Sequence, residues 1–198
     1  MWHYENETRK QGHKIIAGID EAGRGPLAGP VVAASVILPE NCRVEGLNDS
    51  KKLSEKKRNL IFQIIRQKAV AIGIGITYEN IIDQINILQA AKVAMEDSVS
   101  RLSCKPDFLL IDGNQKILST IPQLTIIKGD ALSASIAAAS VIAKVTRDKM
   151  MIQYDDIYPQ YGFRKHKGYG TQDHLKSISK FGPCKIHRKT FKSVKEYC

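Results

Sequence analysis

The sequence predicts a layered α/β domain with a basic C-terminal appendage, and three observations support this fold class. Apolar runs of strand length alternate with helical patterns as far as residue 150. After Tyr158-Pro159 the composition changes to Gly, Lys, His and aromatic residues. A chain of 198 residues that is 43% apolar is long enough for one substantial core. We therefore expect a core over residues 1–155 and a helical extension over 156–198 that packs on it as one structural unit.

The order of the expected elements follows from the apolar pattern. Strands are expected at about 14–21, 30–38, 69–76, 108–111 and 124–127. Helices are expected after Ser54, which is a typical N-cap residue, from Thr77 or Tyr78 towards Leu102, over 131–150, and near 172–181. Strands that alternate with helices in this way are typical of a sheet covered by helices.

The charge of the chain points to a polyanionic partner. The net charge is +10, and residues 151–198 hold ten Lys or Arg against four acidic residues, whereas residues 1–150 hold twenty against sixteen. Clustered basic side chains gain free energy when they displace counterions from phosphates. Four cysteines without a C-x-x-C pair favour a reducing cytoplasm. The longest apolar stretch is too short to span a bilayer, so we expect no membrane contact.

Four acidic residues stand at the ends of expected elements. Asp20 and Glu21 end the first strand, Asp112 follows the strand at 108–111, and Asp130 precedes the Ala-rich helix. Buried acids cost several kcal/mol without a partner, and ligand sites of α/β sheets commonly form at strand ends. The sequence therefore suggests that the four carboxylates converge on a divalent metal.

Each acid also has an ordinary structural interpretation. Asp112 before Gly113 is typical of a turn, and Asp130 is typical of a helix N-cap. Asp20 and Glu21 are neighbours in a strand, so their side chains point to opposite faces unless the backbone twists or bulges there.

The type of ligand favours Mg²⁺ or Mn²⁺ over zinc. Hard cations prefer carboxylate oxygen, whereas the five histidines are scattered without metal-ligand spacing. Two such ions about 4 Å apart activate a water molecule and stabilise a leaving oxygen in phosphoryl transfer.

Glycine-rich and basic segments supply candidate contacts to nucleic acid. The triplet Gly23-Arg24-Gly25 follows the acid pair but lacks the G-K-[ST] ending of a nucleoside triphosphate loop. The basic run over 51–58 is either a solvated helix face or, at Lys51, a phosphate contact. Tyr169 lies between glycines beside basic residues, as in segments where a ring stacks on a nucleic-acid strand. Ser140 and Lys144, one helical turn apart, have core packing or helix solvation as their default interpretation.

In their order along the chain, five motifs resemble those of bacterial ribonuclease HII, the type 2 ribonuclease H. The motifs are I-D-E-A-G-R-G-P-L-A-G-P, L-N-D-S-K-K-L, L-I-D-G-N, K-G-D…S-I-A-A-A-S-V-I-A-K-V-x-R-D and H-K-G-Y-G-T, which run from residue 19 to 171. Gly182-Pro183 and His187-Arg188 are similar to the C-terminal segment of that family. Ribonuclease HIII is the related alternative, but it departs from the G-R-G triplet and usually carries an additional N-terminal domain.

The resemblance implies a ribonuclease H-like mixed sheet flanked by helices, with a helical C-terminal extension, and it implies a role for each matching residue. Asp20, Glu21, Asp112 and Asp130 would be the catalytic, metal-binding carboxylates. Gly23, Arg24 and Gly25 would sense the ribose 2′-hydroxyl, and Tyr169 would pack on the sugar beyond the RNA-to-DNA junction. The phosphate backbone would contact Asn48, Lys51, Ser140 and Lys144.

The activity that the resemblance implies is metal-dependent endonucleolytic cutting 5′ to a ribonucleotide, in RNA/DNA hybrids or in a DNA duplex, which leaves 3′-hydroxyl and 5′-phosphate ends. Such an enzyme would support ribonucleotide removal and RNA primer processing. We expect a monomer, and a sliding-clamp contact stays open. Two other classes of protein stay open as well. One is a hybrid-binding protein without catalytic activity, but a phosphate binder gains nothing from four acidic residues near its ligand. The other is a different metal nuclease, which needs a free end or joins strands.

Overall fold

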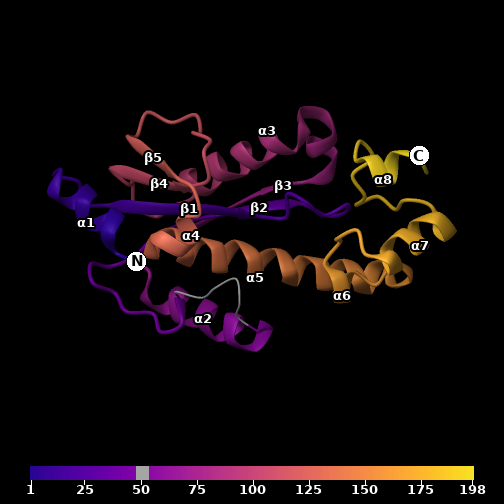
Figure 1. Ribbon diagram of the computed structural model, residues 1–198, viewed down its shortest axis with the longest axis horizontal. Helices are drawn as coiled ribbons and strands as arrows, with labels where there is room; N and C mark the ends of the chain where they lie inside the picture. The colour runs from indigo at the N-terminus through magenta and orange to yellow at the C-terminus, as the bar shows by residue number, and fades with distance from the viewer. Residues whose placement is uncertain (48–53) are drawn as a thin grey trace.

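The computed structural model describes residues 1–47 and 54–198 (Figure 1). Its strands are β1 (Ile16–Ala22), β2 (Val31–Ile37), β3 (Ala71–Thr77), β4 (Phe108–Asp112) and β5 (Gln123–Ile126). Its helices are α1 (His3–Lys10), α2 (Glu55–Lys68), α3 (Glu79–Ser100), α4 (Gly129–Leu132), α5 (Ala134–Ile157), α6 (Phe163–His166), α7 (Gln172–Phe181) and α8 (Lys192–Lys195). A 3₁₀ turn at Pro159–Tyr161 joins α5 to α6.

One mixed five-stranded sheet with the order β3-β2-β1-β4-β5 forms the centre of the molecule. β1, β2 and β3 are joined as antiparallel neighbours, whereas β4 and β5 run parallel to β1. β1 therefore has an antiparallel partner on one side and a parallel partner on the other. Because β1 and β4 are parallel, the acidic residues that follow their apolar runs lie at the same edge of the sheet.

Helices cover both faces of the sheet (Figure 1). α3 packs on β2 and β3, and the long α5 packs on β1 and β2 from the opposite face, with α2 against α5. The alternating apolar residues of β2 enter both resulting cores: Ala34 and Val36 face α5, and Val31 and Ala33 face α3. The mixed sheet between helical layers confirms the predicted fold class.

A third apolar cluster ties the C-terminal segments to α5 and to the loop after β1. Met151 on α5, Leu27 in the loop, and Phe163 and Ile178 in the C-terminal helices are buried together. The backbone of this loop also pairs with the C-terminal segment, since Gly29 N donates to Ile186 O at 2.8 Å. The glycine-rich loop is thus held between the sheet and the C-terminal helices.

Most expected elements are present within a few residues, but the short helices α1, α6 and α8 are additional to them, and the helix expected over 131–150 differs. The short helix α1 was not predicted, because its residues are mostly polar and show no apolar stripe. The helix expected over 131–150 is divided into α4 and α5 at Ser133, whose hydroxyl caps α5 by accepting a hydrogen bond from Ile136 N.

The buried Glu5 on α1 explains why this polar helix docks. Its Oε1 accepts hydrogen bonds from Ser133 Oγ at 2.7 Å and Ser135 N at 2.9 Å, at the start of α5. We expect Glu5→Ala to lower the free energy of unfolding by about 1–3 kcal/mol, because buried donors lose their acceptor. Glu7→Ala on the exposed side of α1 should leave the free energy of unfolding nearly unchanged, because solvent screens its pair with Lys10. Urea unfolding of both variants tests this, and equal losses would contradict it.

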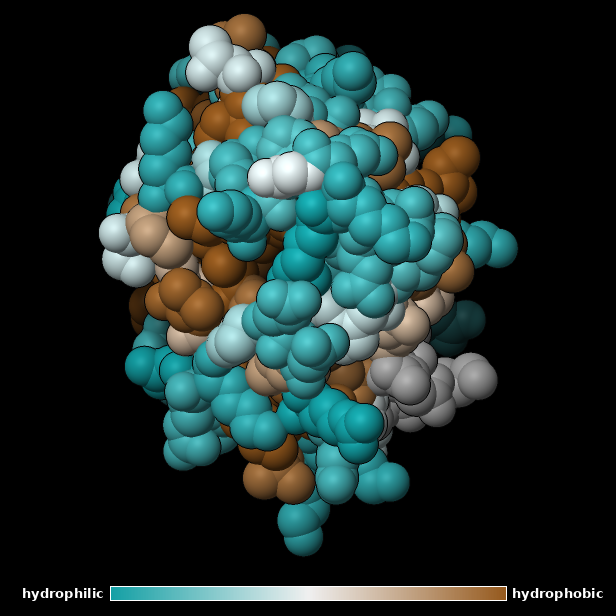
Figure 2. Space-filling view, turned by 90° about the vertical axis from the view of Figure 1, so that its left-hand side faces the viewer, coloured by the Kyte–Doolittle hydropathy of each residue, from teal (hydrophilic) through white to brown (hydrophobic). Residues whose placement is uncertain are grey.

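The surface is mixed in character. Viewed from the end where α1 lies, hydrophilic side chains cover most of the face and hydrophobic patches are scattered among them (Figure 2). Among the residues that the structure describes, no helix is long and apolar enough to cross a membrane. All four cysteines are free thiols.

Candidate active site

The ends of β1 and β4 bring Asp20 and Asp112 to neighbouring positions. Ile19 is paired with Ile111 in the parallel register, and each aspartate is the next residue along its strand. Asp112 Oδ1 accepts hydrogen bonds from Gly129 N at 2.6 Å and Asp130 N at 3.4 Å, which fixes the start of α4 against β4. Asp130 lies in the first turn of α4, whose N-cap is Lys128, so the N-cap interpretation of Asp130 is wrong. Three predicted acids are thus gathered at one edge of the sheet.

Asp20 is a buried carboxyl in an unfavourable electrostatic environment. Only 6% of the residue is exposed. Burial, followed by the charges of Glu21 and Asp112, raises the pKa of Asp20 well above its usual range, and a hydrogen bond from Ser140 opposes this effect only in part. A cation at this position would offset both the desolvation and the repulsion.

Glu21 occupies the other side of the same strand end. β1 pairs regularly with β2 through Ala22, without a bulge, so Asp20 and Glu21 keep the alternate directions of strand neighbours. Burial raises the pKa of Glu21, while Arg24, whose Nη1 lies 3.2 Å from Glu21 Oε1, lowers it in part. The charge of Asp112 acts on both acids.

The chemistry of these donors suits a hard divalent cation. All four predicted ligands offer carboxylate oxygens, and the raised pKa values of Asp20 and Glu21 show that positive charge would stabilise their ionised forms. Within 1–47 and 54–198, no group of three or more His, Cys, Asp or Glu side chains converges closely enough to count as a ready-made metal site.

The loop after β1 has a special conformation at Gly23. Its φ is +98°, and a Cβ there would lie 2.1 Å from Arg147 Nε and 2.8 Å from Pro30 O. Both the backbone and the space therefore require glycine. Gly25 is different, because its φ is not in the left-handed range and a Cβ would meet only the ring of Tyr169, at 3.8 Å.

A buried arginine holds the carbonyl groups of this loop. Arg188 has no exposed surface, and its guanidinium donates to the carbonyls of Gly23, Arg24, Pro26 and Gly29 at 2.5–3.0 Å. Burial lowers the pKa of Arg188 to about 9, so it keeps its charge at neutral pH. The carbonyls of Gly23 and Arg24 in the G-R-G triplet thus face the buried guanidinium of the C-terminal segment.

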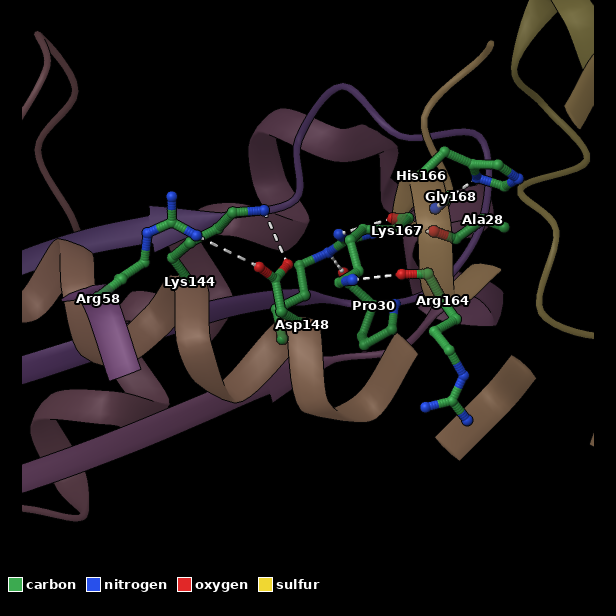
Figure 3. A network of polar contacts seen from close by, with 10 residues as sticks. Ala28, Pro30, Arg58, Lys144, Asp148, Arg164, His166, Lys167 and Gly168 are labelled. Carbon is green, nitrogen blue, oxygen red and sulfur yellow. Dashed lines mark hydrogen bonds and ion pairs between the residues drawn. The ribbon is translucent and has the colours of Figure 1, made fainter. Parts of the chain in front are cut away.

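A second buried arginine joins the loop after β1 to residues 167–169, which we call the Tyr169 segment. Arg147 on α5 donates to the carbonyls of Ala28 at 3.0 Å, Pro30 at 2.9 Å and Lys167 at 3.0 Å. The three acceptor residues lie together beside α5 (Figure 3). Leu27 N also donates to Gly168 O at 2.8 Å. The G-R-G loop and the Tyr169 segment therefore form one connected unit.

A cavity of about 390 Å³ opens where these segments meet the sheet edge. Its lining combines residues far apart in the sequence: Glu21, Ala22, Gly23, Arg24, Gly25, Arg58, Ser140, Val141, Lys144 and Tyr169. Glu21 and Arg24 also line a smaller neighbouring cavity that reaches Asp112 and Lys92. The two cavities thus bring Glu21 and Asp112 together with the G-R-G triplet and the predicted contacts of α5, whereas Asp20 and Asp130 line neither of them.

Two basic side chains of the cavity, Arg58 and Lys144, lie against Asp148. Lys144 Nζ donates to Asp148 Oδ1 at 2.7 Å, and Arg58 Nη1 lies 3.7 Å from Asp148 Oδ2 (Figure 3). Lys144 Nζ also lies 5.9 Å from the centroid of the Tyr169 ring, which is 46% exposed. The pair of cations and the ring form one wall of the cavity.

Two predicted contacts, Asn48 and Lys51, lie outside the residues that the structure describes.

The roles of Arg147 and Arg188 were not predicted from the sequence. Arg147 continues the apolar stripe of Ala139 and Ala143 on α5 at a spacing of four residues. A charged residue on such a stripe indicates a buried side chain with hydrogen-bond partners.

Comparison with known proteins agrees with these observations. The family model of Ribonuclease HII matches residues 17–194. A Ribonuclease HII of Geotalea uraniireducens (strain Rf4) is 58% identical over 197 residues, which is 100% of this chain and 91% of that protein. A Ribonuclease HII of Bacillus cytotoxicus is 59% identical over 196 residues, 99% of this chain and 75% of that protein.

Solved structures share the fold. The ribonuclease H2 of Pyrococcus horikoshii OT3 has a TM-score of 0.78 at 24% identity over 93% of this chain and 97% of its own. The RNase HII of Archaeoglobus fulgidus, solved in a complex with PCNA, has a TM-score of 0.77 at 25% sequence identity, over 90% of this chain and 96% of its own. Bst-RNase HIII, solved with Mn²⁺, has a TM-score of 0.69 at 16% sequence identity, over 92% of this chain and 68% of its own.

The match extends over nearly the whole chain and includes the acids at the sheet edge, the G-R-G loop and the Tyr169 segment. It establishes metal-dependent cleavage of RNA in RNA/DNA hybrids and at ribonucleotides embedded in DNA as the activity of this chain. The chain belongs to the ribonuclease HII family.

Proposed function

We propose that Asp20, Glu21, Asp112 and Asp130 hold two divalent cations, Mg²⁺ or Mn²⁺, and that cleavage occurs at the phosphate 5′ to a ribonucleotide. The observation that carries this proposal is the position of Asp20 and Asp112 at paired ends of adjacent parallel strands, where burial, and then the charges of Glu21 and Asp112, raise the pKa of Asp20. When bound, the cations supply an activated water and stabilise the departing 3′ oxygen. The products would then carry 3′-hydroxyl and 5′-phosphate ends.

The residues of the chain perform the positioning. Gly129 N and Asp130 N hold the Asp112 carboxylate, and Glu21 N donates to Asp20 Oδ1 at 2.7 Å, so both carboxylates are oriented before substrate arrives. Ser140 supports Asp20 by a hydrogen bond and also lines the cavity. These contacts favour a role for Ser140 beside the acid, in addition to the predicted contact with phosphate.

We assign the reading of the 2′-hydroxyl to the backbone of Gly23, Arg24 and Gly25. Arg188 binds the carbonyls of Gly23 and Arg24, so the amides of the triplet are the groups that we expect to meet a ligand at the cavity. The 2′-hydroxyl is what distinguishes the two sugars, and a backbone contact to it carries no base preference. We assign to Tyr169, whose ring lies near Gly25, the packing on the next sugar.

The test of this proposal uses a labelled duplex with one ribonucleotide, incubated with Mg²⁺ or Mn²⁺ beside an all-DNA duplex. We expect one cut, on the 5′ side of the ribonucleotide, with 3′-hydroxyl and 5′-phosphate ends. A cut elsewhere, or cutting of the all-DNA duplex at a similar rate, would contradict the proposal. A closed circular DNA with one ribonucleotide separates this activity from an exonuclease, because an enzyme that needs a free end leaves the circle intact.

The phosphate contact of Lys144 gives a further expected result. Lys144→Met should weaken binding of duplex about equally for all sequences and reduce the slope of log affinity against log salt by about 1. Lys149→Met is the matched control on α5, because Lys149 Nζ lies over the Phe62 ring at 4.5 Å and lines a different cavity. Binding titrations at several salt concentrations measure both slopes. An unchanged slope in Lys144→Met would remove Lys144 from the interface.

The remaining expectations extend the proposal to the whole protein. We propose a monomer that acts in the cytoplasm, in ribonucleotide removal and primer processing, and the four free thiols agree with a reducing compartment. The division into a core over 1–155 and an extension over 156–198 stays a prediction. So does a sliding-clamp contact, although the Archaeoglobus fulgidus relative was solved with PCNA.

A further inference from the structure

Three histidines are buried together behind the Tyr169 segment. His166, His174 and His187 are 9%, 0% and 1% exposed. The rings of His166 and His174 stack at a centroid distance of 4.5 Å, and those of His174 and His187 lie 5.2 Å apart. The cleavage chemistry uses none of them, so their burial needs a separate explanation.

The hydrogen bonds of His174 and His187 run in one direction. His174 Nδ1 lies 2.9 Å from Tyr169 O, which only accepts, so Nδ1 carries the proton and Nε2 of the neutral ring is an acceptor. His187 Nε2, at 3.0 Å from His174 Nε2, must therefore donate. His187 Nδ1 is then an acceptor, and Cys184 N donates to it at 2.9 Å. One tautomer of each ring satisfies the whole chain from Cys184 to Tyr169.

The surroundings keep both rings neutral. Burial lowers the pKa of His174 and of His187 to about 4, and the neighbouring imidazoles add to this effect. Other ionisable groups face the pair as well: the Cys184 thiol, 3.1 Å from His187 Nδ1, whose pKa burial raises to about 11, and Tyr161, whose ring lies 4.9 Å from that of His187. A proton added to His174 Nε2 would face the His187 Nε2–H at the 3.0 Å contact, and one added to His187 Nδ1 would face the Cys184 N–H at 2.9 Å.

The pair connects the two segments that form the cavity. His187 forms an antiparallel bridge with Ala28, in the loop that begins with the G-R-G triplet. His174 binds the Tyr169 carbonyl, while Tyr169 N donates to His166 O at 3.0 Å. The backbone of Tyr169 is thereby fixed on both sides of its Cα, and its ring lies over Gly25.

We propose that His174 and His187 are positioning residues for the ribonucleotide-dependent cut, which act by fixing the Tyr169 carbonyl and, through it, the ring at the cavity. This inference rests on the role proposed for Tyr169. Neither histidine contacts substrate in this account. Their contribution is to hold the ring in one orientation relative to the G-R-G loop.

The tautomers are measurable without any activity. ¹⁵N-histidine-labelled protein at pH 7 should show, by two-bond NMR correlations, a neutral His174 protonated at Nδ1 and a neutral His187 protonated at Nε2. A proton on His174 Nε2, or a charged ring at either position, would overturn the proposal. Failure of the wild-type protein to cut a ribonucleotide-containing duplex would count against the proposed function and leave this measurement intact.

Two substitutions of His174 then separate positioning from simple packing. His174→Asn keeps an amide N–H near the place of Nδ1, whereas His174→Leu removes this donor and leaves the Tyr169 carbonyl with only the hydrogen bond from Thr171 N, at 2.8 Å. We expect His174→Leu to lower kcat on the single-ribonucleotide duplex about tenfold with little change in KM, and His174→Asn to recover most of the loss. His3→Leu on the exposed face of α1 is the control and should leave kcat unchanged.

The decisive comparison is made in the Tyr169→Ala background. If His174 acts through Tyr169, His174→Leu should cause little further loss of kcat there, because the ring that it positions is already absent. Equal activity of the Asn and Leu variants, or an undiminished tenfold loss in the Tyr169→Ala background, would overturn the proposal. Thermal unfolding of each variant shows which of them keep the native fold.

Discussion

Asp20→Asn is expected to lower the cleavage rate on the order of a thousandfold or more, because it removes a carboxylate from a site whose cations supply several kcal/mol of transition-state stabilisation. The same substitution should stabilise the metal-free protein. Burial and the charges of Glu21 and Asp112 raise the pKa of Asp20, so its ionised form opposes folding at neutral pH. The gain should be about 1.4 kcal/mol for each unit by which folding raises that pKa.

The sign of the pH dependence is part of this prediction. The folded state binds the Asp20 proton more tightly than the unfolded state, so the cost of ionisation is present above the ordinary pKa of an aspartate, about 4, and disappears as the pH falls below it. The stability difference between Asp20→Asn and wild type should therefore shrink on acidification. Urea titrations with EDTA at several pH values measure it.

Asp97→Asn is the matched control for this experiment, because Asp97 is paired with Arg101 on α3 at 2.8 Å, away from the candidate site. Its cleavage rate should stay near that of wild type. Added Mn²⁺ should raise the melting temperature of wild type and Asp97→Asn, and raise that of Asp20→Asn much less. An Asp20→Asn variant that is both fully active and no more stable would contradict the assignment of Asp20.

Gly23→Ala is expected to have the second large effect, on the fold of the loop and hence on activity. Its φ of +98° disfavours alanine, and the new Cβ would lie 2.1 Å from Arg147 Nε and 2.8 Å from Pro30 O. Either the loop or the buried guanidinium must move, and Arg147 would then lose hydrogen bonds to carbonyls that have no access to water. We expect a loss of roughly 3 kcal/mol or more in unfolding free energy and little remaining cleavage.

Gly25→Ala is the control in the same triplet. A Cβ at Gly25 would stand 3.8 Å from the Tyr169 ring, an ordinary contact, so stability should change by less than about 1 kcal/mol. Because Gly25 lines the cavity, this variant should still bind substrate less well, which kcat and KM on the single-ribonucleotide duplex resolve. An equal loss of unfolding free energy in Gly23→Ala and Gly25→Ala would show that the close contacts at Gly23 do not cause the loss.

The parts of the site that sequence predicted are those written in consecutive residues. Asp20, Glu21 and Asp112 each follow an apolar run, and that pattern correctly places them at strand ends, because a buried strand stops where its side chains become polar. The motif order around them was specific enough to indicate the family. Whether the strand bulges at Asp20 and Glu21 was left open by the sequence, and only the pairing of β1 with β2 shows that it stays regular through Ala22.

The parts that sequence missed depend on contacts between distant segments. Arg188 binds carbonyls more than 150 residues earlier in the chain, and no local pattern encodes that contact. The docking of α1 likewise depends on one buried acid, Glu5, that meets the start of α5. The tautomers of His174 and His187 follow only from distances between rings. Such roles belong to polar groups in the interior, whose partners the apolar pattern does not reveal.

In the proposed mechanism, the acids and the G-R-G loop together select and cut one phosphate. Moving a single ribonucleotide along a duplex tests this selection directly. A set of duplexes of identical sequence carries the ribonucleotide at successive positions, and the nick is mapped on a sequencing gel with Mg²⁺ or Mn²⁺. We expect the nick to move with the ribonucleotide and always to fall on its 5′ side. A nick that stays at a fixed distance from the duplex end, or that follows the base sequence, would contradict it.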